Sequence, residues 1–336
     1  MVLAGQEGSN QVGKGKLVNH PQTWAVVLAG GDGTRLRSLT RSIAGEDRPK
    51  QFCRLCGSRT LLAQTRFRLA PAISPDRTLY TVVKAHERFY SDELADVTPS
   101  RVVVQPSNKG TTAAVIYSLR RITSLAGDPI VGFFPTDHHY LREMRFAASV
   151  RLAAKVVMSR PDRLILLGAS AEYPEVEYGW IEPSGRLDCR LTKSLLRVNR
   201  FWEKPASHVA QALLARGCLW NTFVMIGRAS AFLEMLKSAV PGMVRALSAD
   251  RPLPGTELAG SNADAAFARL TPGDFSKQVL SVSTEQLAVL RLGNVGWSDL
   301  GTPERVVSVM ARSGLRSHWH GAPHNENLEN LAESVS

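Results

Sequence analysis

The sequence predicts an α/β protein with a mainly parallel sheet and helices on both of its faces. Short apolar runs typical of buried parallel strands recur through the first half of the chain. Helix-like stretches separate these runs at the spacing of β-α-β units. The first run ends in a cluster of glycines, which is typical of a strand that leads into a loop with a bound ligand.

The first half of the chain supplies the expected parallel strands and their covering helices. The predicted strands cover residues 24–29, 78–83, 101–104, 130–134 and 164–167. The predicted helices cover residues 61–69, 111–125 and 146–158. Because strands and helices alternate at this spacing, the helices are expected to cover both faces of the sheet.

After about residue 170 the alternation ends, and a smaller mixed part is expected. Strands are predicted at residues 178–182, 194–202 and 219–226, and helices at 207–216 and 229–239. A stretch rich in Pro and Gly at 250–260 is predicted to be a surface loop. The last helix is expected at 302–312, with Thr302 as its cap and Pro303 in its first turn.

Both ends of the chain are expected to be flexible extensions of one domain. Residues 1–21 are polar, with neither the apolar core nor the cleavage site of a signal peptide. Residues 313–336 lose the helical periodicity. The sequence therefore predicts a domain over residues 22–312 between two tails, in a cytoplasmic protein.

The composition favours a globular protein that binds small anions. Of the 336 residues, 44% are hydrophobic and 21% are charged, and no apolar run is long enough to span a membrane. The net charge of +11 is spread along the chain without a basic run. Small phosphorylated substrates explain such a distribution better than a nucleic acid or a membrane does.

The four cysteines are expected to be free thiols. Cys53 and Cys56 form a C-x-x-C pair, but Cys189 and Cys218 are too far apart in sequence to complete a zinc site. Zinc or redox chemistry is the less favoured alternative.

The loop after the first strand, at residues 28–37, predicts a phosphate-binding site. Three glycines let the backbone approach a ligand closely and direct N–H groups at anionic oxygens. A Walker A loop would need Gly-Lys-Ser or Gly-Lys-Thr, but Gly33 is followed by Thr34 and Arg35. The dinucleotide fingerprint would need glycine in place of Leu36. An ordinary turn between a strand and a helix is the remaining alternative.

Two motifs resemble the signature of the sugar-nucleotide pyrophosphorylases. They are L-A-G-G-x-G-T-R-L at residues 28–36 and P-K-Q-F at residues 49–52, and the second resembles the mannose-1-phosphate guanylyltransferases in particular. The resemblance implies a Rossmann-like nucleotidyltransferase fold, similar to GT-A. It also implies a nucleotide-binding part at about 22–170 and a sugar-binding part at about 171–312.

The resemblance implies that the glycine loop wraps a nucleoside triphosphate. Arg35 and Lys50 would neutralise its phosphates, and Lys204 would hold the phosphate of the sugar, so these three cations are the predicted catalytic residues. Within the loop the predicted nucleotide-binding residues are Leu28, Ala29, Gly30, Gly31, Gly33, Thr34 and Arg35, and Lys50 is predicted to join them.

Two aspartates are predicted to bind Mg²⁺. Asp137 follows a predicted strand, where open α/β sheets bind their ligands, and its surroundings resemble the family's P-x-D-H. Asp299 lies in a segment similar to the family's W-x-D-x-G, whose aspartate is the second metal ligand. Taken alone, Asp137 is also consistent with a helix cap and Asp299 with a turn.

Three further segments resemble the family's sugar-binding motifs. They are E-Y-G-W at 177–180, E-K-P at 203–205 and L-W-N-T at 219–222. The resemblance implies that the sugar-binding residues are Gly179, Glu203, Lys204 and Asn221.

The segment 105–111 leaves the identity of the base open. The resemblance places Gln105, Gly110 and Thr111 near the base, but Gln105 stands where the guanylyltransferases have Glu. A carboxylate accepts from both guanine N1–H and the N2 amine, whereas an amide satisfies only half of this pattern. Thymidylyl- and uridylyl-transferring relatives are therefore the nearest alternative.

These features together predict a nucleotidyltransferase that uses Mg²⁺ and converts GTP and mannose-1-phosphate to GDP-mannose. The sugar phosphate would attack the α-phosphorus in line and expel pyrophosphate, so no general base and no covalent intermediate is required. A non-catalytic regulator that binds nucleotide sugars is the alternative from another class. The sequence leaves the oligomeric state open, with a homodimer as one option.

Overall fold

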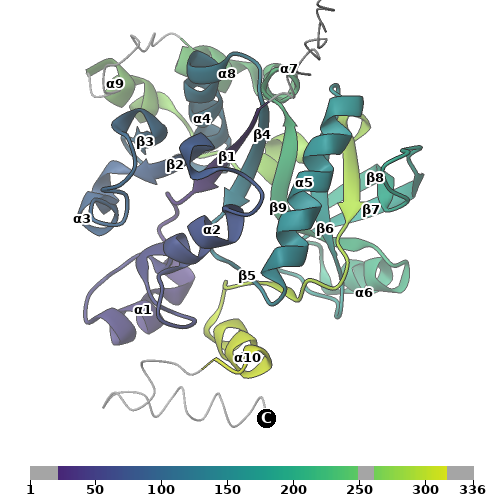
Figure 1. Cartoon of the computed structure of the whole chain (residues 1–336), viewed down its shortest axis with the longest axis horizontal. Coiled ribbons are helices and arrows are strands. Elements are labelled where there is room, and N and C mark those ends of the chain that lie inside the picture. The colour runs from purple at the N-terminus through teal and green to yellow at the C-terminus, as the bar shows by residue number, and fades with distance from the viewer. Residues whose placement is uncertain (1–21, 249–260, 316–336) are drawn as a thin grey trace, which may run out of the picture.

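The computed structural model describes residues 22–248 and 261–315, which form helices on both sides of a large sheet (Figure 1). The strands are β1 (Thr23–Leu28), β2 (Thr78–Val83), β3 (Val102–Gln105), β4 (Ile130–Pro135), β5 (His138–Tyr140), β6 (Leu164–Ser170), β7 (Gly179–Arg186), β8 (Leu195–Glu203), β9 (Leu219–Arg228), β10 (Leu287–Arg291) and β11 (Trp297–Asp299). The helices are α1 (Arg37–Ala44), α2 (Leu61–Leu69), α3 (Glu87–Tyr90), α4 (Gly110–Ala126), α5 (Glu143–Ser159), α6 (Ser207–Ala215), α7 (Ala229–Ala239), α8 (Pro241–Ser248), α9 (Ser261–Arg269) and α10 (Pro303–Ser313).

The large sheet is parallel in its first half and mixed in its second half. Its strand order is β3-β2-β1-β4-β9-β6-β10-β8-β7. β1 pairs in parallel with both β2 and β4, whereas β9 lies antiparallel between β4 and β6. The α/β fold class is therefore confirmed, and the mixed strands extend the same sheet. A separate two-stranded sheet pairs β5 with β11.

The strands of the parallel half carry apolar side chains on both faces, because helices cover both. In β1, Ala25 and Val27 belong to the core cluster that α2 and α5 complete. Trp24 and Val26 face the opposite way, into the cluster that α4 and α7 complete. This two-sided burial explains why the strands appear in the sequence as continuous apolar runs.

The C-terminal helix α10 packs near the glycine loop. Val306 and Met310 share a core cluster with Leu36 and Leu39, which come directly after that loop. Figure 1 shows α10 and α1 at the same end of the molecule. The predicted cap is confirmed, because Thr302 Oγ1 accepts a hydrogen bond from the N–H of Arg305 at 3.5 Å and Pro303 begins the helix.

The cysteines are free thiols, as expected. Cys53 and Cys56 lie in the core cluster that α10 completes. Burial raises the pKa of the Cys53 thiol to about 11 and the pKa of the Cys56 thiol to about 12. Both thiols therefore stay protonated at neutral pH and are poor nucleophiles and poor metal ligands.

The elements that the sequence analysis did not predict are α1, α3, α8, α9, β5, β10 and β11. Ser313 is the last residue of α10 and not the first residue of a tail. The predicted extension at 1–21, the loop at 250–260 and the tail from 316 lie outside the described residues. Within 22–248 and 261–315, no helix is long and apolar enough to cross a membrane.

Candidate active site

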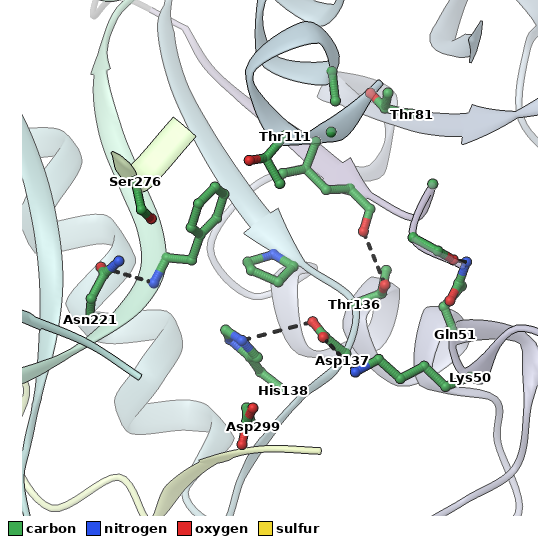
Figure 2. A pocket seen from close by; sticks show the side chains of 18 of the residues that line it. Lys50, Gln51, Thr81, Thr111, Thr136, Asp137, His138, Asn221, Ser276 and Asp299 are labelled. Atoms are coloured by element: carbon green, nitrogen blue, oxygen red, sulfur yellow. Dashed lines mark hydrogen bonds and ion pairs between the residues drawn. The ribbon is translucent and has the colours of Figure 1, made fainter. Parts of the chain in front are cut away.

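The site lies where β1 and β4 end side by side. These strands are parallel and Leu28 pairs with Pro135, so the glycine loop after β1 emerges beside the segment that carries Asp137. A cavity of about 400 Å³ opens at this edge of the sheet, and Figure 2 shows the side chains that line it. This is the edge at which open α/β sheets bind ligands.

Most of the predicted site residues, from both halves of the chain, line this one cavity. They are Leu28, Gly30, Gly31, Arg35, Lys50, Gln105, Gly110, Thr111, Asp137, Gly179, Glu203, Asn221 and Asp299.

Four predicted site residues do not line the cavity. Ala29 is fully buried, and its N–H donates to the carbonyl of Thr81. Gly33 adopts a left-handed conformation, with a φ of 61°, immediately before the exposed Thr34. The Lys204 side chain lies 3.9 Å from Glu177, which itself lines the cavity.

The glycine loop is held by Gln51, which the sequence analysis did not assign to the site. The Nε2 atom of Gln51 donates to the carbonyls of Ala29 at 2.9 Å and Gly31 at 2.8 Å. The side chain is buried, so these two bonds fix the direction of the loop backbone. The P-K-Q-F motif could have indicated this role, because its glutamine is the only neutral polar side chain in it.

Lys50 connects the nucleotide side of the cavity to the segment after β4. Its Nζ lies 2.8 Å from Asp137 Oδ2 and donates to the carbonyl of Leu300 at 3.1 Å. Figure 2 shows Lys50 and His138 on two sides of the Asp137 carboxylate. Burial opposes ionisation of Asp137, but the charges of Lys50 and His138 and the hydrogen bonds to the carboxylate together outweigh it and hold the pKa of the carboxyl well below its usual range.

Asp299 lies beside Asp137 because β11 pairs with β5. Asp299 is opposite His138 in this pairing, and the Leu300 N–H donates to the Asp137 carbonyl at 2.8 Å. The Asp299 carboxylate accepts from the Tyr178 hydroxyl at 2.6 Å and from Arg305 Nη1 at 2.8 Å and 3.0 Å. Tyr178 and Arg305 are thus further site residues. Neither was identified from the sequence, although Tyr178 belongs to the E-Y-G-W motif.

The two carboxylates offer the donor set that Mg²⁺ prefers. Mg²⁺ takes hard oxygen ligands and usually binds one or two carboxylates together with substrate phosphates. Among the contacts of the described residues, Asp137 Oδ1 lies 3.8 Å from His138 Nε2, and Asp299 Oδ2 accepts from Arg305. Both therefore retain oxygen lone pairs for a cation, and the residues fit the predicted metal.

The sugar side of the cavity is formed where β7, β8 and β9 meet. Gly179 pairs with Glu203, and a Cβ atom at Gly179 would lie 2.9 Å from Glu203 Oε2 and 3.3 Å from Asn221 Cβ. Only glycine, which has no side chain, leaves space beside Glu203 and Asn221 at this corner of the cavity. Burial raises the pKa of Glu203 to about 7, and the negative charge of Asp274 adds to the effect against the opposing charges of Lys204 and Lys277.

The raised pKa of Glu203 predicts how stability changes with pH. A carboxyl with a higher pKa in the folded state than in the unfolded state destabilises the fold as the pH rises from about 4.5 to 7. Glu203→Gln removes this effect, so the variant should be more stable than the parent at pH 8 by about 1–2 kcal/mol after allowance for solvent screening. Urea unfolding at pH 8 and at pH 4 measures the difference, which should vanish at pH 4. A variant less stable than the parent at pH 8 would contradict the assignment.

The base side of the cavity is formed by the end of β3 and the start of α4. Gln105 is buried, and its Oε1 has no hydrogen-bond partner among the described residues. A Cβ at Gly30 would lie 3.0 Å from Gln105 Nε2, so the glycine lets the loop pass close to this amide. Thr111 Oγ1 accepts from the N–H of Phe275 at 2.9 Å, and Gly110 packs against Gly273. A buried acceptor without a partner is suited to a donor on a ligand.

The fold and the cavity define an α/β protein with a cavity at the carboxyl edge of its sheet, and comparison with known proteins shows its family. The chain belongs to the nucleotidyl transferase family, whose model matches residues 24–313.

Its relatives include a xanthan biosynthesis protein and a mannose-1-phosphate guanylyltransferase. The chain is 29% identical over 306 residues to the xanthan biosynthesis protein XanB of Xanthomonas campestris, covering 88% of this chain and 61% of XanB. It is 30% identical over 298 residues to a mannose-1-phosphate guanylyltransferase of Sinorhizobium fredii, covering 85% of this chain and 54% of the relative. The chain thus spans somewhat more than half the length of these relatives.

A solved structure from Thermus thermophilus, described as a mannose-1-phosphate geranyltransferase, resembles this fold. The two superimpose with a TM-score of 0.72 at 25% identity, over 88% of this chain and 80% of the other.

Proposed function

We propose that this chain transfers a nucleotidyl group from a nucleoside triphosphate to a hexose-1-phosphate and releases pyrophosphate. The preferred substrates are GTP and mannose-1-phosphate, and the product is GDP-mannose. The observation that carries the proposal is one cavity lined by the glycine loop, by the Lys50–Asp137 pair and by the corner of Gly179 and Glu203. The names of several relatives agree with these substrates. A cytoplasmic location accompanies the proposal.

The proposed reaction is an in-line displacement at phosphorus. An oxygen of the sugar phosphate attacks the α-phosphorus of the nucleotide, the bond to the β-phosphate oxygen breaks, and pyrophosphate leaves. The attacking oxygen is already anionic, so no residue has to remove a proton. Arg35 and Lys50 neutralise the nucleotide phosphates, and Lys204 attracts the sugar phosphate from the rim of the cavity. Catalysis comes from orientation and from screening the repulsion between two polyanions.

A Mg²⁺ ion on Asp137 and Asp299 would add charge neutralisation of the phosphates. Neighbouring residues of the chain orient these two carboxylates. Tyr178 and Arg305 fix the orientation of the Asp299 carboxylate, and Lys50 fixes that of Asp137.

Gln105 supports a second candidate for the base. Its Oε1 can accept from guanine N1–H while its Nε2 donates to O6, but the same pair of bonds suits N3–H and O4 of uracil or thymine. A thymidylyl- or uridylyltransferase of the same fold is therefore the alternative. The amide lacks the second acceptor that would also bind the guanine N2 amine.

We expect a real but incomplete preference for GTP, with measurable activity on a second nucleotide. The missing charge-assisted bond to guanine corresponds to about 1 kcal/mol of discrimination or somewhat more. Gln105→Glu should sharpen the preference several-fold. Pyrophosphate release from four nucleoside triphosphates, each with several hexose-1-phosphates, measures it. If UTP or dTTP exceeds GTP with every sugar phosphate, the guanylyltransferase proposal fails, and if no pair reacts, the non-catalytic alternative stands.

A further inference from the structure

Glu177 lies between the two cations that are predicted to bind phosphate on opposite sides of the site. Its Oε2 accepts a hydrogen bond from Arg35 Nη1 at 3.0 Å and lies 3.9 Å from Lys204 Nζ. Arg35 belongs to the glycine loop and Lys204 follows β8, so these two cations come from the two halves of the chain. Glu177 lines the cavity with its side chain half-exposed. A carboxylate therefore occupies the space into which the substrates would bring their phosphates.

We propose that the Glu177 carboxylate competes with substrate phosphate for Arg35 and Lys204. The site is thereby selective for substrates whose phosphates reach both cations. The inference rests on the proposed function, in which these two cations contact different substrates. A tethered carboxylate acts at a high effective concentration. A small anion that reaches only one of the two cations competes weakly with the Glu177 carboxylate. A polyphosphate that binds Arg35 and a sugar phosphate that binds Lys204 displace the carboxylate together.

The local structure keeps Glu177 in this position and leaves it displaceable. The preceding residues are anchored to α10, because Glu175 pairs with Arg305 at 2.7 Å and Glu172 pairs with Arg312 at 3.2 Å. The N–H of Glu177 donates to Glu175 Oε1 at 2.8 Å. The backbone is therefore fixed, while the ion pairs of the half-exposed carboxylate are weak enough to exchange.

The test is pyrophosphate binding by the full chain, measured by titration calorimetry in buffer without metal or nucleotide. Two like charges about 4 Å apart repel by about 1 kcal/mol even in water, which corresponds to about a fivefold change in affinity. Glu177→Gln should therefore bind pyrophosphate at least about fivefold more tightly than the parent, and Glu177→Ala should change in the same direction. Asp162→Asn is the control, since it removes one negative charge from an ion pair, with Arg163 at 3.9 Å, that does not line the cavity, and its affinity should equal that of the parent.

The sign of the change decides the proposal. Weaker pyrophosphate binding by Glu177→Gln would mean that the carboxylate only holds Arg35 in place. Equal binding by the variant and the parent would mean that the carboxylate does not compete, and so would the absence of binding by both. Either result overturns the inference, provided that thermal unfolding shows the variants folded. Pyrophosphate carries neither base nor sugar, so its binding does not depend on which substrates the chain uses. If Glu177→Gln binds pyrophosphate more tightly than the parent but the parent forms no nucleotide sugar, only the proposed function is refuted.

Discussion

Asp137→Asn is expected to lower the rate of nucleotidyl transfer by at least about a thousandfold, the largest loss among the variants considered. The substitution removes the charge that would hold Mg²⁺ and also the partner of the Lys50 ammonium, 2.8 Å away. Asp299→Asn should have a comparable effect, because its carboxylate lies on the neighbouring strand of the same site. Pyrophosphate release measures turnover, and Mn²⁺ binding followed by electron paramagnetic resonance measures the metal site independently.

The matched control for these variants is Asp128→Asn. Asp128 also forms an ion pair, with Arg228 at 3.7 Å, but it lies before the first residue of β4, at the opposite end of that strand from Asp137. This variant should keep full activity, and all three variants should retain cooperative thermal unfolding. A fully active Asp299→Asn variant, or turnover that is unchanged in EDTA, would refute the metal assignment.

Arg35→Ala is expected to lower kcat/KM for the nucleotide by about a hundredfold or more, since its guanidinium matches the charge that develops on the leaving pyrophosphate. Most of the loss should appear in kcat, because the interaction strengthens as the bond to the leaving group breaks. Steady-state kinetics with each substrate varied in turn separates the two parameters.

Arg37→Ala is the control for Arg35→Ala, because it removes the same charge two residues along the chain. Arg37 forms no ion pair among the described residues and lines a different, smaller cavity. Its loss should leave kcat/KM within about twofold, as usual for a surface substitution. If the only defect of Arg35→Ala is a raised KM for the sugar phosphate, its proposed place at the nucleotide phosphates is wrong.

The sequence predicts the parallel half of the sheet well because its signals are local. The run at 78–83 is mostly apolar and is buried throughout, since helices cover both faces of β2, and the structure begins and ends the strand at these residues. The approach of the glycine loop to Asp137 is also predictable, because the carboxyl ends of parallel strands lie at one edge. Short strands such as β5 and β11 carry too few residues for a periodic signal.

The supporting contacts of the site could not be predicted, because they depend on pairings that are distant in sequence. Tyr178 reaches Asp299 across 121 residues, and Glu177 reaches Arg35 across 142 residues. These contacts require the insertion of β9 between β4 and β6 and the docking of α10. The sequence around Tyr178 and Glu177 indicates neither event. Gln51 is different, since it lies within the recognised P-K-Q-F motif, although the motif alone assigned it no role.

The packing of α10 also determines when a ribosome-bound chain can acquire the site. Asp299 and Arg305 are synthesised late, yet both contact Tyr178, and the neighbouring Leu300 and Val306 pack against the segment that follows the glycine loop. The nascent chain can form β1 to β4 early, because those strands pair with one another. Asp299 can reach the site only after β11 has left the exit tunnel, and Arg305 can fix its orientation only after α10 has followed. A chain interrupted before residue 299 would therefore keep most of its sheet but lack one of the two aspartates predicted to bind the metal.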